Sequence, residues 1–320
     1  RYTSKLPRVP GMSRSPNTIV TVEDSKKGWA VATALVIDHL YGGIIPTIKY
    51  HKIRKAGEPL KTFGGRASGP DPLKSSIDFI IETFSKAQRR QLTPLECHDI
   101  CCKIGETVVV GGVRRSALIA LFDKDDLEMR GAKMGEWWID AQHRHIANNS
   151  GVYETRPSRV DFDHDWNQMV DGASGEPGFH NLYATKAHIE KNCPLRKLTD
   201  ENGDLLARGA NPCHEIALRP YQFCNLSMVT VRPDDTEEVI MEKIEVATIF
   251  GTMQATLTNF DFVRPIWAET TADEALLGTT MTGVQDNPLT NINALKNDPH
   301  TFNERLERFK EHAIETNRIW

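Results

Sequence analysis

The segment Asn211-Pro212-Cys213-His214-Glu215-Ile216-Ala217-Leu218 carries an amide, a thiol and a carboxylate at alternate positions. In an extended segment alternate side chains point the same way, so Asn211, Cys213 and Glu215 are expected to face one site. Pro212 favours this conformation, because the residue before a proline is pushed towards an extended backbone. Phe223-Cys224-Asn225-Leu226 follows and opens an apolar run that predicts a strand. A tight loop would bring the two thiols together.

Cys213 and Cys224 have a simpler interpretation as two buried structural thiols, since free cysteine is among the most buried residue types. The residues around Cys213 argue against it. A glutamate on the same face would be aimed into an apolar core, which is energetically costly. The pattern therefore favours a chemical site.

Four more stretches stand out: three that combine glycine with polar or charged residues, Gly64–Pro70, Gly111–Ala117 and Ser174–Phe179, and the polar stretch Ala147–Ser150. With the Asn-x-Cys-x-Glu pattern and the later cysteine, they resemble the large catalytic chain of the ribonucleotide reductases. The Asn-Pro-Cys form is most similar to the adenosylcobalamin-dependent class. The stretches stand in the family's order and extend to about residue 283.

Strands alternate with helices along the chain, which predicts an α/β fold with parallel strands. Helices are expected around Trp29–Leu40, Ile77–Ala87, 94–104, 133–143, 158–171, 236–258 and 301–320. Strands are expected at 44–50, 107–110 (buried), 117–122 and 276–284, with strand and turn at 144–155, a hairpin at 199–208 and loops at 1–18, 54–72 and 172–178.

The resemblance implies part of a ten-stranded α/β barrel, built from two five-stranded halves, with a central finger loop that carries the key cysteine. Residues 1–72 would include the effector and specificity region. Residues 73–210 would belong to the first half of the barrel, and 211–320 to the finger loop and the start of the second half.

The resemblance also implies the chemistry, which is ribonucleotide reduction for DNA synthesis. Cys213 would become a thiyl radical and abstract the 3′ hydrogen, with Glu215 as general base. Asn211 would hold the substrate hydroxyls, and Cys224 would be half of the dithiol that reduces the 2′ carbon. His214 departs from the small residue expected there, and strand alternation would point its side chain away from Cys213.

Nucleotide contacts are implied at three further places. The predicted substrate contacts are Ala67, Ser68, Gly69, Asn148, Asn149 and Ser150. The predicted effector contacts are Asp24, Ser25, Lys27, Gly64, Gly65 and Arg66. Two plainer interpretations remain open: a simple helix cap at 24–27, and a strand-to-helix turn at 64–70. For Arg114 and Arg115, a salt-bridged structural role and a phosphate contact are equally open.

The other cysteines are Cys97, Cys101, Cys102 and Cys193. The first three lie with His98 on a predicted helix, where core packing is expected, because a zinc site would need a second ligand pair at a recognised spacing. Cys193 precedes a proline in a loop. The family's redox partner for Cys224 is therefore expected upstream of residue 1, and the chain, which begins with Arg1, is expected to be a fragment.

The composition is that of an ordinary globular protein, with 320 residues, 39% hydrophobic content and a net charge of −4. This charge gives no case for nucleic-acid binding, and no signal peptide or membrane-spanning run is expected. Six cysteines do not make a disulfide scaffold, so a reducing cytoplasm is predicted. By resemblance, the cofactor is adenosylcobalamin and the partners are a ribonucleoside di- or triphosphate, a deoxynucleotide effector and a thioredoxin-like reductant.

Two alternatives stay open. The same reaction could use a partner subunit whose metal cofactor generates the radical, although Pro212 and the stretch 111–116 favour cobalamin. The chain could also be a non-catalytic nucleotide-binding fragment, which the missing partner cysteine favours.

Overall fold

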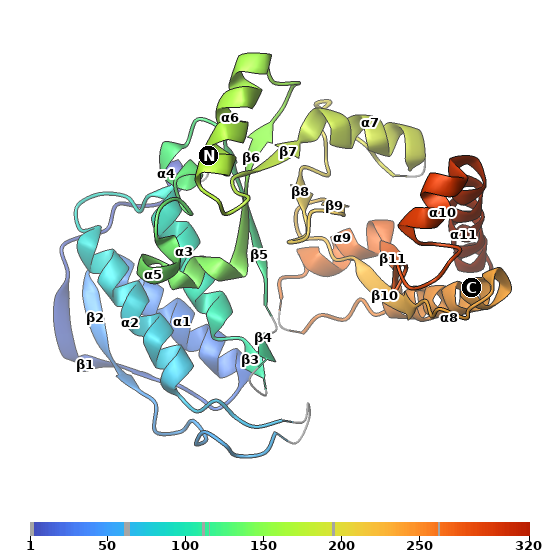
Figure 1. The fold of residues 1–320 in the computed structure, drawn as a ribbon. Coiled ribbons are helices and arrows are strands. Elements are labelled where there is room, and N and C mark those ends of the chain that lie inside the picture. Colours follow the sequence, from blue (N-terminus) through green and yellow to red (C-terminus); the bar gives the residue numbers. More distant parts are fainter. Residues whose placement is uncertain (1–2, 61–64, 111–112, 115, 194–195, 262) are drawn as a thin grey trace. The chain divides into compact units, whose positions relative to one another are not determined.

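The computed structural model describes residues 3–60, 65–110, 113–114, 116–193, 196–261 and 263–320 (Figure 1). The chain divides into two compact units. The first comprises residues 1–194 with 209–217, and the second comprises 195–208 with 218–320. Each unit has its own hydrophobic core.

The first unit begins with a short 3-10 turn, Thr3–Lys5, and a parallel strand pair, β1 (Ser13–Thr21) with β2 (Ile44–Lys49). The prediction of a loop over 1–18 is wrong from Ser13 onwards. Pro16 and the polar residues around it hid the strand, and the pairing register shifts between Ser15 and Ile19 to accommodate them. Pairing with β2, which sequence periodicity does not reveal, makes this segment a strand.

Three helices pack beside this pair and confirm the predicted ones: α1 (Lys26–Tyr41), α2 (Asp71–Lys86) and α3 (Pro94–Glu106). Local capping explains two of the starts. Ser25 Oγ accepts the Gly28 N–H at 2.9 Å, and Thr93 forms a reciprocal capping box with Glu96. The apolar faces of these helices bury Val36, Leu40, Ile77, Ile80 and Phe84, among others, in one core.

The predicted buried strand over 107–110 is wrong in extent and, at Val108, in burial. Only Val109–Val110 (β3) forms a strand, and it pairs antiparallel with Val113–Arg114 (β4). Val108 is 44% exposed, because the chain folds back on itself here and does not join a parallel sheet. Residues 111, 112 and 115 lie outside the described residues, so neither interpretation of Arg114 and Arg115 is decided.

A three-stranded parallel sheet follows, made of β5 (Leu118–Asp123), β6 (Ala147–Tyr153) and β7 (Gly178–Asn181) in that order. The first connection carries α4 (Leu127–Arg130), α5 (Trp137–Asp140) and the 3-10 turn Gln142–Ile146. The second carries α6 (Arg159–Asp171), capped by Ser158, and α7 (Leu182–Asn192) follows the sheet. The sequence prediction missed β7 and α7.

Close packing between β6 and β7 favours a glycine at position 178. A Cβ atom there would lie 2.7 Å from Ser150 Oγ, and Ser150 is the residue that pairs with Gly178. Beyond α7, the two-residue strands β8 (Gly209–Ala210) and β9 (Ala217–Leu218) pair with each other and enclose the Cys213 segment.

The second unit is built on the parallel pair β10 (Asn225–Thr230) and β11 (Leu277–Thr282). Helices α8 (Glu237–Ala255) and α11 (Pro299–Ile319) pack with this pair around Val229, Val231, Ile240, Ile244 and Phe309. Helices α9 (Ile266–Glu274) and α10 (Ile292–Asn297), which were not predicted, complete the unit. The hairpin predicted at Asn202-Gly203 is confirmed by a bridge between Thr199 and Leu205.

The architecture is α/β with parallel pairing in β1–β2, β5–β6–β7 and β10–β11, as the sequence predicts. Within the described part of the chain, no helix is both long enough and apolar enough to cross a membrane.

Two glycines of the second unit offer a matched test of this packing. Gly283 has φ +74°, and a Cβ there would lie 2.3 Å from the Val231 carbonyl oxygen. Gly203 has φ +82°, with no neighbouring atom within 4 Å. We expect Gly203→Ala to lower the free energy of unfolding by about 1–2 kcal/mol, the cost of the left-handed backbone alone. Gly283→Ala should cost roughly 2–5 kcal/mol, because the clash adds to that strain. Urea titration of both variants measures the difference, and equal midpoints would contradict it.

Candidate active site around the Cys213 turn

The Cys213 segment is a tight turn, so the prediction of an extended strand with alternating side chains is wrong. The His214 N–H donates to the Asn211 carbonyl at 2.9 Å, and the Ile216 N–H donates to Asn211 Oδ1 at 2.9 Å. His214 has φ +73°, which an extended segment does not contain. An asparagine side chain that bonds the backbone beyond it stabilises such a turn.

The turn nevertheless presents its chemical groups to solvent. Cys213 and Glu215 are exposed, and Asn211 is half-buried with its side-chain oxygen engaged in the turn. A thiol and a carboxylate two residues apart on one exposed turn are accessible to a substrate. The structure therefore keeps the three residues within one short segment by a different backbone geometry from the predicted one.

Two residues of the β6–β7 sheet hold the turn. Asn148 Nδ2 donates to the Pro212 carbonyl at 2.5 Å. His180 Nδ1 and His214 Nε2 share a hydrogen bond, and their rings stack with centroids 4.6 Å apart. The prediction that the His214 side chain points away from the site rested on strand alternation, which the turn abolishes.

The other predicted substrate residues of β6 are buried. Asn149 is 2% exposed, and neither polar atom of its side chain has a hydrogen-bond partner among the described residues. Its backbone N–H donates to Glu176 at 3.2 Å. Ser150 is buried too, beside Gly178. Of the three, Asn148 alone is exposed, and the substrate roles of all three stay predictions.

A buried ion pair supports this end of the sheet. Lys133 Nζ lies 2.9 Å from Glu176 Oε1 and donates to the Ala147 carbonyl at 2.5 Å. Burial raises the pKa of Glu176, and the hydrogen bond from Lys133 opposes this shift only in part. The pair ties the first residue of β6 to the loop before β7.

Cys224 belongs to the second unit and directly precedes β10. It is half-buried. The neighbouring Phe223 ring stacks on Trp267 with centroids 4.6 Å apart and meets Phe260 edge-on at 5.0 Å. This aromatic contact fixes the chain just before the cysteine. Cys213 lies in the first unit, so the pairing of the two thiols stays a prediction.

Comparison with known proteins identifies the family of this chain, although no protein-family model matches it. Adenosylcobalamin-dependent ribonucleoside-triphosphate reductase of Lactobacillus delbrueckii subsp. bulgaricus is 32% identical over 277 residues, which are 84% of this chain and 36% of that protein. The enzyme of the same name from Levilactobacillus brevis is 31% identical over 276 residues, 82% of this chain and 34% of that protein. The chain belongs to the ribonucleotide reductase family.

One solved structure has a fold similar to that of this chain. The crystal structure of a B12-dependent (class II) ribonucleotide reductase matches with a TM-score of 0.68, over 89% of this chain and 42% of that one, at 24% identity. The likeness shows a shared fold. This ribonucleotide reductase chain spans about a third of the length of the curated relatives it matches.

Three of the predicted effector residues of this ribonucleotide reductase chain, Asp24, Ser25 and Lys27, lie at or just before the start of α1. Ser25 is its N-cap, as the plainer interpretation expects, and Lys27 is exposed. Asp24 does not cap the helix. It forms an ion pair with Arg54 at 2.7 Å. The nucleotide role of all three stays a prediction, and Gly64 lies outside the described residues.

The stretch from Gly65 to Gly69 forms the return arm of a hairpin. Arg66 pairs with Pro59, and the Ala67 N–H donates to the Glu58 carbonyl at 2.7 Å. Gly69 has φ +72°, and a Cβ there would lie 3.0 Å from the Ala56 nitrogen, so the turn itself requires this glycine. Ser68 is half-buried, and its hydroxyl donates to the Gly69 carbonyl.

The cysteine cluster on α3 packs in the core in part. Cys102 is fully buried and Cys97 packs against the main core, which confirms the prediction for these two, whereas Cys101 is exposed. Burial raises the pKa of Cys97 to about 11 and that of Cys102 to about 12, so both thiols stay protonated at neutral pH. Among the described residues, no group of three or more His, Cys, Asp or Glu could hold a metal ion.

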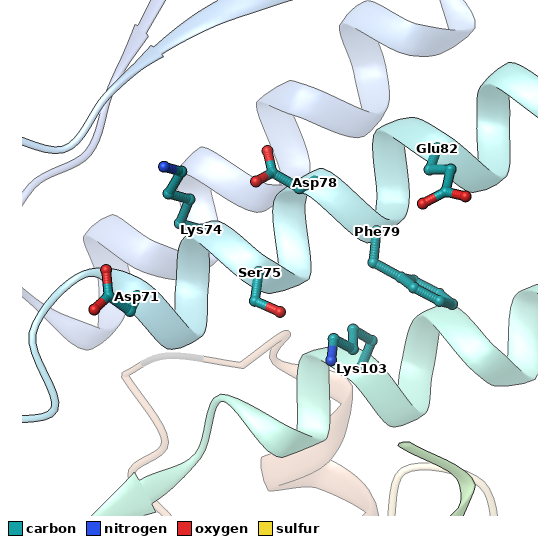
Figure 2. Close-up of a pocket in the computed structure, with 7 residues that line it drawn as sticks. All are labelled: Asp71, Lys74, Ser75, Asp78, Phe79, Glu82 and Lys103. Atoms are coloured by element: carbon teal, nitrogen blue, oxygen red, sulfur yellow. The ribbon is translucent and has the colours of Figure 1, made fainter. Parts of the chain in front are cut away.

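A shallow pocket of about 450 Å³ lies on the surface of α2 and α3 (Figure 2). Its charged lining residues are Asp71, Asp78, Glu82, Lys74 and Lys103. Carboxylates outnumber the cations, so the pocket is poorly suited to a nucleotide phosphate. It coincides with none of the predicted contacts.

The sequence prediction assigned no role to three residues that contact the turn or support the sheet beside it: His180, Glu176 and Lys133. Glu176 and His180 lie in or beside the quoted stretch 174–179, but β7 was not predicted, so nothing placed His180 opposite the turn. Lys133 had no local signal, because its partner lies 43 residues away.

The buried His98 predicts an acid-sensitive fold. Burial lowers its pKa to about 4, and its Nε2 lies 3.6 Å from Cys102 Sγ. The folded state therefore favours the neutral ring, and this stability is complete above pH 6.5 and is lost as the pH falls towards 4. Between pH 7 and pH 5, the wild-type protein should lose about 2 kcal/mol more unfolding free energy than His98→Gln does. Urea titrations at the two pH values measure this difference, and identical pH dependence would contradict it.

Proposed function

We propose that the protein containing this chain reduces ribonucleotides to 2′-deoxyribonucleotides by a thiyl-radical mechanism. The observation that carries the proposal is the exposed turn that holds Cys213 and Glu215 with Asn211 inside five residues. The names of the relatives, which match across this turn, support the reaction and favour a ribonucleoside triphosphate over a diphosphate as substrate.

Each predicted site residue of this chain has its own role in the proposed reaction. Cys213 suits hydrogen-atom transfer, because an S–H bond is weak enough to be broken and reformed in each turnover. As a thiyl radical, it abstracts the 3′ hydrogen of the ribose, while Glu215 accepts the proton of the 3′-hydroxyl. Asn211 holds the hydroxyls. The 2′-hydroxyl then leaves as water, and Cys224 and a second thiol supply the two electrons that reduce the 2′ carbon and become a disulfide. Cys213 finally returns the hydrogen atom to the 3′ carbon.

For adenosylcobalamin to serve as the cofactor, this chain must present a thiol that is accessible to it. Cys213 is exposed and meets this requirement. When bound, the cofactor supplies the first radical, which the protein's ordinary side chains cannot generate. This chain's own task is to present the Cys213 thiol and to keep Glu215 beside the substrate. The Asn-Pro-Cys sequence and the relatives' names support the cobalamin class.

We infer that the parallel strands form part of a ten-stranded α/β barrel, with the Cys213 turn as the tip of its finger loop. Residues 1–72 would include the effector region, 73–210 the first half of the barrel, and 211–320 the finger loop and the start of the second half. The fold shared with the class II enzyme supports this arrangement.

Nucleotides of two kinds, substrate and effector, would contact this chain. We assign substrate contacts to Ala67, Ser68, Gly69, Asn148, Asn149 and Ser150. We assign contacts with a deoxynucleotide effector to Asp24, Ser25, Lys27, Gly64, Gly65 and Arg66. The exposed Lys27 at the start of α1 suits an anionic ligand, since a helix N-terminus attracts negative charge. A thioredoxin-like reductant in the cytoplasm would regenerate the dithiol.

Cys213→Ser tests the central step. The serine O–H bond is too strong to transfer a hydrogen atom, so deoxynucleotide formation should fall by several orders of magnitude in the complete protein with adenosylcobalamin. Hydrogen exchange between cofactor and solvent should disappear as well, whereas nucleotide affinity should stay within a factor of a few. Cys101→Ser, which changes another exposed thiol, is the control. Retained turnover in Cys213→Ser would exclude the thiyl role.

Cys224→Ser should separate radical formation from reduction. The first hydrogen abstraction requires Cys213 alone, so exchange between cofactor and solvent should persist. Reduction at the 2′ carbon should fail and released base should accumulate, which chromatography of the nucleotide products detects. Normal repeated turnover in Cys224→Ser would refute its redox role.

A further inference from the structure

The Cys213 turn is anchored on both sides of the cysteine. On one side Asn148 Nδ2 donates to the Pro212 carbonyl, and on the other the His180 ring bonds and stacks on the His214 ring. Cys213 itself lies between the two anchored residues. The two contacts hold Pro212 and His214, the residues directly before and after Cys213. Together they restrict the position of the Cys213 thiol more than either contact alone would.

The sheet brings the two anchors to one face. In the β6–β7 register, His180 pairs with Val152, and paired residues of parallel strands point to the same side. Asn148 precedes Val152 by four residues on β6, so it shares that side by strand alternation. The turn is therefore attached to two adjacent strands of one sheet.

The histidine contact is suited to a permanent anchor. His180 is 2% exposed, and a buried ring nitrogen without a partner would be costly. The His214 ring forms a hydrogen bond with Nδ1 of His180. The backbone of His214 has φ +73°, a conformation that glycine adopts more easily. A bulky residue in this strained position is explained by what its ring contacts.

We propose that His180 is a positioning residue for the Cys213 thiol and acts through His214. This inference rests on the proposed reaction, in which the thiyl sulfur must meet the 3′ hydrogen at close range. A turn released from β7 would keep its chemical groups but lose their alignment, so kcat would fall more than KM would rise.

The test compares two replacements of His180 in the complete protein. His180→Leu removes the ring nitrogen but keeps the site apolar, whereas His180→Asn places an amide where Nδ1 was. His214→Gly removes the contact from the other side and also relieves the backbone, so it serves if His180→Leu does not fold. His188→Leu, which changes an exposed histidine on α7, is the matched control.

Two readouts are needed. Amide hydrogen exchange in peptides covering residues 209–218 reports whether the turn is held, and kcat for deoxynucleotide formation reports whether the thiol is aligned. In His180→Leu we expect exchange about tenfold faster and kcat about tenfold lower, the effect of one lost hydrogen bond. His180→Asn should stay within about threefold of wild type in both, and His188→Leu should be unchanged.

Each other outcome has a definite meaning. Unchanged exchange in both His180→Leu and His214→Gly would overturn the anchor. Faster exchange with unchanged kcat, or equal loss of kcat in His180→Asn and His180→Leu, would overturn the positioning role. A wild-type protein that makes no deoxynucleotide would refute the proposed function instead, and the exchange measurement would still decide whether His180 holds the turn.

Discussion

The parallel pairing of β6 with β7 is the constraint on which the Cys213 turn depends. Its register opposes Ser150 to Gly178 so closely that a side chain at position 178 would have to displace the Ser150 hydroxyl. The same register places Asn148 and His180 on one face, where each bonds a different residue of the turn. A shift of β7 by one residue would turn the His180 side chain to the face opposite Asn148, and the turn would lose its contact with β7.

Buried charge maintains this register at the cost of desolvation. Lys133 donates hydrogen bonds to Glu176 and to the carbonyl of Ala147, the first residue of β6, and Glu176 accepts a hydrogen bond from the Asn149 N–H. The raised pKa of Glu176 shows that burial outweighs the attraction of Lys133. Such a pair adds little net stability, but removal of one partner leaves the other charge buried and alone. Its role here is to determine where β6 begins relative to the loop before β7.

The second unit presents Cys224 by other means. Stacked aromatic rings fix Phe223, and the pairing of β10 with β11 fixes Asn225, so the cysteine stands between two restrained neighbours. The two cysteines of the proposed reaction thus belong to different units and depend on different interactions. Polar contacts hold the turn of Cys213, whereas packing and strand pairing hold the chain around Cys224.

The sequence by itself determined the family, the chemical groups and most helices, because these signals are local. Ser25 and Thr93 mark their helices within three residues, and Asn211, Cys213 and Glu215 lie within five residues in a pattern that resembles the family's motif. Only the tertiary structure decided that the Cys213 segment is a turn, that β7 exists and that His180 contacts His214. The reason is physical: a short strand is stable only through its neighbour, and the partners in these contacts lie tens of residues apart. Local propensity carries no information about such pairs.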